Sequence, residues 1–237
     1  MRVEYIDHSG FFVECEDTCL LFDFDAGTPP EVPAGKRLIV FASHHHPDHL
    51  SPNAFAYGER VPDTRYLLGC DVTLSAPNCA KLGITEDMLP RCTRLHKDDV
   101  VHVGETRVQA LRSTDMGVAF LVECNGRRIY HAGDHNLWIW HQDANFDKSQ
   151  TERFYYEIEK LRGLKIDAAF LPLDPRLGDE YWRGFDAFAR LIEPKMMFPM
   201  HMVGDTDIIR RVKALECAAA YRDRIADIRA RGDSFIL

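Results

Sequence analysis

Long apolar runs and a disulfide pattern are both missing from this sequence. No uninterrupted hydrophobic stretch approaches the ~18 residues of a membrane-spanning helix, and the N-terminal MRVEYIDHSG places acids where a signal peptide has an apolar core. The seven cysteines are odd in number and scattered along the chain, unlike the spacing of a disulfide-bonded scaffold. These absences predict a reduced, cytoplasmic protein with no membrane partner.

An excess of positive charge is missing as well. Lys and Arg number 29 against 37 Asp and Glu, so the formal net charge is −8, and the sequence pI is about 5.7. An acidic surface repels phosphate backbones, which argues against a nucleic-acid partner and against a nuclease. We expect the protein to act on a small-molecule substrate instead.

The composition that remains is ordinary for a globular protein. The 237 residues are 46% hydrophobic and 28% charged, which suffices for a real hydrophobic core. No repeat, low-complexity tract or linker divides the chain, so we expect a single domain spanning residues 1–237. Nothing in the sequence indicates an oligomeric state.

Strand-like segments dominate the first 130 residues, and helical segments follow. The clearest feature is a hairpin in MGVAFLVECNGRRIYHAGD, where Asn125-Gly126 joins two apolar runs. Later segments alternate between helix and strand, and residues 205–230 read as a helix with one possible break before a last strand at 234–237. This order predicts an α/β fold, an αβ/βα sandwich with helices outside two β-rich halves.

Metal-ligating residue types gather where three apolar segments end, in VFASHHHPDH, RIYHAGDHN and MMFPMH. His44 and His46 are two residues apart and point the same way from a strand end, whereas His45 faces the other side. Imidazole and carboxylate are the ligands that hydrolytic dications prefer, so we expect one or two divalent metal ions here. The candidate ligands are His44, His46, Asp48, His49, Asp134 and His201.

The H-x-H-x-D-H pattern after a hydrophobic strand resembles the signature of the metallo-β-lactamase-fold hydrolases. Gly133-Asp134 and His201 are similar, in order and spacing, to that family's strand-end aspartate and its last metal ligand. The early DHSGFFVE and LLFDFD are most similar to the lactonase-like branch, which includes ascorbate-6-phosphate lactonase. The resemblance covers nearly the whole chain, and it implies a four-layer sandwich in which Asp134 bridges two metals.

One position departs from this resemblance. The family usually carries another histidine shortly before the hairpin that leads to Gly-Asp, but this region reads LRSTDMGVAF. Asp115 is the only strong ligand there, and it either replaces the imidazole or only hydrogen-bonds the turn. Replacement by a hard oxygen donor favours manganese or iron over zinc. Without a replacement, the first metal is held more loosely or only one metal binds.

Four further residues are candidates for the substrate pocket. His8 matches an early position near the site in the lactonase-like branch, and His135 directly follows Asp134. Trp138 stands on a loop where an aromatic ring could cover a substrate, and Arg176 could hold an anionic group. Each has a structural alternative: a turn residue, hydrophobic packing under a loop, or a surface ion pair.

The resemblance implies hydrolysis by a metal-bound hydroxide, because a dication brings the pKa of its bound water near neutrality. We expect attack on an ester, lactone, amide or phosphodiester bond, with Asp48 and Asp134 as catalytic residues. Asp48 would orient the nucleophile and accept its proton. Two alternatives stay open: a di-iron oxidoreductase of the same fold, which usually carries glutamate where His46 stands, and a non-catalytic metal-binding protein, which the missing histidine allows.

Overall fold

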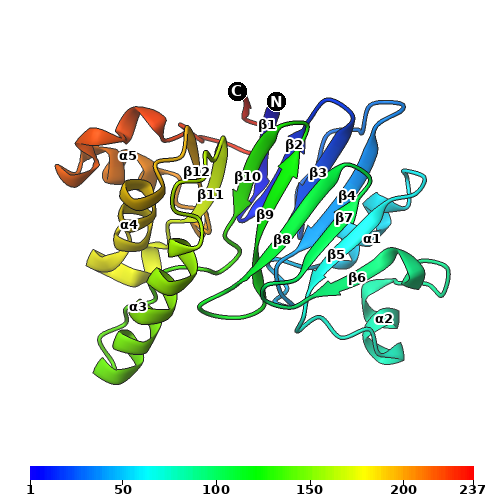
Figure 1. Ribbon diagram of the computed structural model, residues 1–237, viewed down its shortest axis with the longest axis horizontal. Helices are drawn as coiled ribbons and strands as arrows, with labels where there is room; N and C mark the ends of the chain where they lie inside the picture. The colour runs from blue at the N-terminus through cyan, green and yellow to red at the C-terminus, as the bar shows by residue number, and fades with distance from the viewer.

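Two β-sheets face each other at the centre of the computed structural model, which describes residues 1–237 (Figure 1). The first sheet has seven strands, of which β1, β3, β4, β5 and β6 run in the same direction. In spatial order its strands are β13 (Ser234–Ile236), β1 (Arg2–Asp7), β2 (Gly10–Glu14), β3 (Thr18–Phe22), β4 (Arg37–Ala42), β5 (Arg65–Gly69) and β6 (Cys92–Leu95).

The second sheet has six strands and mixed direction. Four of them form an antiparallel meander, after which β11 pairs in parallel with β10 and β12 pairs in parallel with β11. In spatial order they are β12 (Met196–Met200), β11 (Ala168–Pro172), β10 (Arg127–His131), β9 (Val118–Cys124), β8 (Thr106–Arg112) and β7 (Val100–Val103). The predicted Asn-Gly hairpin joins β9 to β10, with Asn125 at φ 48° and Gly126 at φ 72°, as a two-residue turn of this kind requires.

Helices cover the outer faces of both sheets. Figure 1 shows α1 and α2 beside the first sheet and α3, α4 and α5 beside the second. Their bounds are α1 (Pro52–Gly58), α2 (Ala76–Leu82), α3 (Ala144–Glu159), α4 (Arg183–Ile192) and α5 (Asp207–Ala214). The predicted four-layer αβ/βα sandwich is confirmed. None of these helices is long and apolar enough to cross a membrane.

Each helix is amphipathic or capped in the way its sequence indicates. Ser51 accepts a hydrogen bond from the Asn53 amide and so caps α1, whose first residue is Pro52. In α4 the side chains at positions 185, 188, 189 and 192 are buried, which is the spacing of one helical face. That face packs toward β11 of the second sheet.

The core consists of two apolar clusters, one of 49 and one of 19 buried residues. Strand β4 shows how they are separated. Ile39 and Phe41 belong to the larger cluster, and Leu38 and Val40 belong to the smaller one, so β4 is buried on both faces. Burying each such side chain contributes about 1.5–3 kcal/mol, which holds the end of β4 in a fixed place.

The C-terminal tract differs from its prediction. Residues 205–230 contain only the helix α5, followed by the 3-10 turns Cys217–Ala220 and Arg222–Arg224. The helix ends at Ala214 because Leu215 is extended, at φ −64° and ψ 142°. Tyr221, Ile225 and Ile228 are buried in the larger cluster, so tertiary packing of these side chains replaces the helix expected from local propensity.

The strands deliver chemically active residues to one shared edge. The carboxyl ends of β1, β3 and β4 meet at one edge of the first sheet, since these strands run the same way. The parallel strands β10, β11 and β12 likewise end together in the second sheet. The Val118 amide donates to the Ser43 carbonyl at 3.0 Å, which ties the end of β4 to the start of β9.

Candidate metal centre

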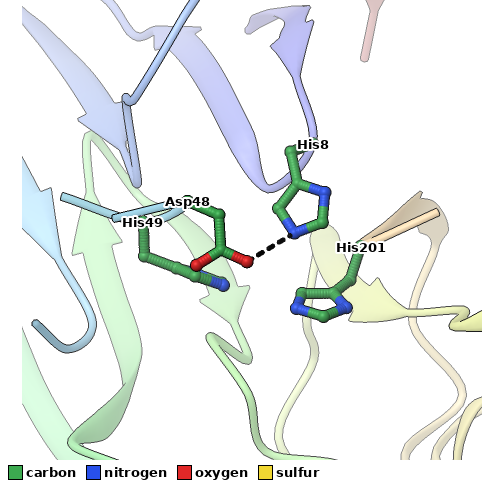
Figure 2. Close-up of side chains that lie close together, drawn as sticks. All are labelled: His8, Asp48, His49 and His201. Atoms are coloured by element: carbon green, nitrogen blue, oxygen red, sulfur yellow. Dashed lines mark ion pairs between the residues drawn. The ribbon is translucent and has the colours of Figure 1, made fainter. Parts of the chain in front are cut away.

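The predicted ligands follow the carboxyl ends of β4, β10 and β12. Two compact groups result, and within each group the potential ligand atoms all lie within 4.8 Å of one another. We call them the first cluster, which comprises His44, His46 and Asp134, and the second cluster, which comprises His8, Asp48, His49 and His201. Figure 2 shows the side chains of the second cluster turned toward a common centre.

Asp134 lies between the two clusters. Its Oδ2 is 3.5 Å from His44 Nε2, whereas its Oδ1 is 3.2 Å from His49 Nε2 and 3.4 Å from His201 Nε2. The carboxylate is buried. One carboxyl group with an oxygen toward each cluster has the geometry that a bridging ligand needs.

Three potential metal-ligand atoms of these clusters are buried without a hydrogen-bond partner. They are His8 Nε2, His49 Nε2 and Asp134 Oδ1. Buried polar atoms are rarely left unpaired, because each costs about 1–3 kcal/mol of desolvation. A cation placed among these nitrogen and oxygen atoms would satisfy all three, so the residues fit a divalent metal ion.

A buried carboxylate behind His49 sets the orientation of its ring. Asp23 Oδ2 is 2.7 Å from His49 Nδ1, and the Ser43 amide and hydroxyl both donate to Asp23 at 2.7 Å. The Nδ1–H bond leaves Nε2 free to face the second cluster. Asp23 was not among the predicted site residues, although it directly follows the buried strand β3 in LLFDFD.

A second buried carboxylate does the same for His201. Asp174 Oδ2 is 3.0 Å from His201 Nδ1, and Arg176 holds Asp174 through Nε and Nη2 at 3.0 and 2.5 Å. Burial opposes ionisation of Asp174, but His201 and Arg176 together lower its pKa to about 2. Arg176 is therefore committed to a structural ion pair, and its predicted contact with a substrate stays a prediction.

Charges in the two clusters favour the forms that bind metal. Burial raises the pKa of Asp134, but the neighbouring His49 and His201 outweigh it and hold that pKa below its usual range. Burial, and then repulsion from His49, lowers the pKa of His44 to about 4. A carboxylate and a neutral imidazole are therefore present at neutral pH.

His49 behaves differently because it lies between two carboxylates. Burial lowers its pKa, but Asp134 and Asp23 outweigh burial and raise it well above the usual value. The two carboxylates therefore favour a positive charge at this position, which is the charge that a bound metal ion would supply.

The position of the missing histidine is filled by a loop without an imidazole. Thr114 Oγ1 accepts from the Asn136 amide at 2.9 Å, and the Asp115 amide donates to Ser113 Oγ at 3.2 Å. Asp115 is exposed and belongs to neither cluster. Its predicted role as a replacement ligand stays a prediction, and the first cluster comprises three candidate ligands.

The remaining pocket candidates lie at different distances from the clusters. Trp138 is buried, donates from Nε1 to the Asp134 carbonyl at 2.9 Å, and its ring centroid is 5.8 Å from that of His201. His135 stacks on Phe154, with centroids 5.0 Å apart, and burial lowers its pKa to about 3. His8 was predicted as a residue of the substrate pocket, but it lies among the candidate metal ligands of the second cluster.

His45 lies outside both clusters despite its position between two candidate ligands. Its Nδ1 is 2.6 Å from Asp71 Oδ2, and its side chain is half exposed. The pair of His45 and Asp71 has the same chemistry as the pair of His49 and Asp23 but lies outside both clusters. Variants of His45 and Asp71 are therefore matched controls for measurements of metal affinity.

Comparisons with known proteins agree with this architecture. A family model described as "Beta-lactamase superfamily domain" matches residues 2–148, more than half of the chain. A UPF0173 metal-dependent hydrolase of Alkaliphilus metalliredigens is 25% identical over 213 residues, which is 85% of each chain.

Two solved structures share the fold at low identity. A metallo hydrolase from the archaeon Ignicoccus hospitalis is 15% identical with a TM-score of 0.64, over 100% of this chain and 98% of its own. CmlA, a diiron β-hydroxylase from Streptomyces venezuelae, is 15% identical with a TM-score of 0.57, over 90% of this chain and 51% of its own.

Proposed function

The chain belongs to the β-lactamase superfamily, and from this premise we propose that it is a metal-dependent hydrolase acting on a small substrate. The bond we propose is an ester, lactone, amide or phosphodiester. The observation that carries the proposal is the convergence of imidazole and carboxylate groups on both sides of Asp134, with three buried, unpaired ligand atoms on the side of the second cluster. The name of the relative in Alkaliphilus metalliredigens, a metal-dependent hydrolase, supports it.

We assign the two clusters as the residues that hold one or two metal ions. His44 and His46 serve the first position, and His49 and His201 serve the second, with Asp134 shared between them. Nitrogen and carboxylate oxygen donors suit zinc, manganese or iron. A dication held there would lower the pKa of a bound water molecule and would polarise the carbonyl or phosphoryl oxygen of the substrate.

Asp48 is the residue we assign to proton transfer. Its side chain is 46% exposed, whereas that of Asp134 is only 6% exposed, so Asp48 is the cluster carboxylate that solvent reaches most readily. The His8 imidazole, whose Nε2 lies 3.3 Å from Asp48 Oδ2, outweighs burial and holds the pKa of Asp48 below its usual range, so it is ionised at neutral pH. An ionised, accessible carboxylate can orient a water molecule and accept its proton.

A cleft beside His46 is the proposed place for the substrate. It has a volume of about 610 Å³, and its wall includes Met116 from the loop that carries Asp115. Asn78 and Lys81 of α2 also line it. The size suits a small molecule rather than a polymer.

The test is turnover by metal-loaded protein on a panel of esters, lactones, amides and phosphodiesters. We expect one bond class to be hydrolysed, and Asp48→Asn to lower kcat by about 10²–10⁴-fold. Asp99→Asn is the matched control, because Asp99 pairs with His96 outside both clusters and outside the cleft, and it should keep full activity. Metal-loaded protein without turnover on any class would support the non-catalytic alternative. Oxygen consumption with a visible iron absorption band would support the oxidoreductase.

A further inference from the structure

His8 occupies an unusual place on the turn between β1 and β2. Its φ is 44°, a left-handed conformation that a histidine adopts only at a cost. The His201 amide donates to the His8 carbonyl at 3.1 Å, so the turn is attached to the end of β12. This hydrogen bond holds the strained backbone beside the second cluster.

The ring of His8 packs against the second cluster. Figure 2 shows it turned toward Asp48 and His201, and its centroid lies 4.3 Å from that of His201 and 5.7 Å from that of His49. Its side chain is only 15% exposed. His8 Nε2 is 3.3 Å from Asp48 Oδ2, yet it is buried without a well-formed hydrogen bond.

The number of potential metal-ligand groups differs between the two clusters. The first cluster offers two imidazoles and Asp134, since the loop that leads into β9 contains no histidine. The second cluster offers three imidazoles and Asp48, and an oxygen of Asp134 also faces it. More donors around one cation give a tighter site when all of them converge, as these four do within 4.8 Å.

We propose that His8 is a metal ligand of the second cluster through Nε2, and that this position binds its metal more tightly than the first. The chain thus places one imidazole on the β1–β2 turn and none near Ser113. This inference rests on the proposed function only in requiring that a metal binds, and it makes no claim about the bond that is cleaved.

The competing explanation is that His8 only donates a hydrogen bond to Asp48. Two variants separate the explanations. His8→Asn removes the imidazole and tolerates positive φ, because asparagine is favoured in left-handed backbone. His8→Gln keeps an N–H donor of similar reach but not a ligating nitrogen lone pair. His45→Ala is the matched control, since His45 is a neighbouring histidine outside both clusters.

The experiment is a Co²⁺ titration of the full chain in competition with a chelator, followed by absorption. We expect wild type to bind two ions with unequal affinity. Both His8 variants should weaken the tighter step by about 100-fold or more, the upper end of what losing an outer partner costs, and His45→Ala should leave both steps unchanged. Unchanged tight binding in His8→Asn, or retention of tight binding in His8→Gln, would overturn the inference.

A second measurement uses the unaltered protein. In ¹⁵N-histidine-labelled protein loaded with ¹¹³Cd²⁺, a ligating nitrogen shows one-bond coupling to cadmium. Coupling at His8 Nε2 is the expected result, and its absence while His49 and His201 are coupled would refute the role of His8. Metal binding with no hydrolysis would contradict the proposed function while leaving this inference intact.

Discussion

Replacing Asp23 by asparagine tests how the second cluster is oriented. Asp23 is completely buried and receives three hydrogen bonds, two from Ser43 and one from His49 Nδ1. Asparagine has the same shape but only one acceptor oxygen. If that oxygen faces His49, the amide NH2 meets the Ser43 amide N–H and leaves a buried donor unpaired. If it faces the Ser43 amide, His49 loses the partner that keeps Nε2 toward the cluster.

The magnitude follows from these contacts. Losing an outer partner of a metal-ligating histidine costs about 10–100-fold in metal affinity, which is roughly 1.4–2.8 kcal/mol. The unpaired donor costs about 1–3 kcal/mol of unfolding free energy. Metal affinity is measured by chelator competition, and stability by denaturant unfolding of the metal-free protein.

Asp71→Asn provides the control for Asp23→Asn. Asp71 accepts from His45 in the same way, but outside both clusters, so this variant should leave metal affinity unchanged. An affinity of Asp23→Asn within twofold of wild type would refute the reasoning. A loss of the same size in Asp71→Asn would show that the effect does not depend on the cluster.

Three further predictions concern the backbone, the pH response and the substrate cleft. Gly133→Ala should lower metal affinity and melting temperature together, because φ is +51° and a Cβ would lie 2.6 Å from that of Ser43; unchanged melting would contradict this. Burial raises the pKa of Asp167, but Lys195 at 2.6 Å, the Arg128 amide and the Arg127 side chain outweigh it and lower that pKa. The stability that Asp167 contributes is therefore fully present above about pH 4, the pKa of an aspartate in the unfolded chain, and is lost as the pH falls through the lower pKa of the folded state. Asp167→Asn should be less stable at pH 7, and its stability should depend less on acid. Unfolding curves identical to those of wild type from about pH 2 to 7 would contradict this. Thr73→Trp, on the cleft wall, should raise KM without changing metal content, and an unchanged KM on the hydrolysed substrate would exclude the cleft.

The fold and the convergence of most candidate ligands could be predicted because both depend on local sequence features. Strand ends with His44, Asp134 and His201 are visible as apolar runs followed by ligating types, and parallel strands bring such ends to one edge. The Asn-Gly hairpin is equally local. The helical tract near the C-terminus was predicted wrongly because burial of Tyr221 and Ile225, which is a tertiary effect, decides its structure.

The residues that support or complete the clusters could not be predicted in the same way. Asp23 reaches His49 only because β3 pairs with β4 in one particular register, and a single sequence carries no spacing signal for that pair. His8 joins the second cluster only because the turn adopts positive φ and packs beside β12. The lactonase-like branch, the single domain, the cytoplasmic location and the identity of the metal stay predictions.

Anomalous diffraction at the metal absorption edge, on crystals of the chain loaded with Zn²⁺ or Mn²⁺, tests the central claim most directly. The account predicts a strong peak among His8, Asp48, His49 and His201, and a second peak, weaker at limiting metal, beside His44 and His46, with Asp134 between the two. Peaks confined to exposed histidines such as His45, or no peak within reach of Asp134, would contradict it.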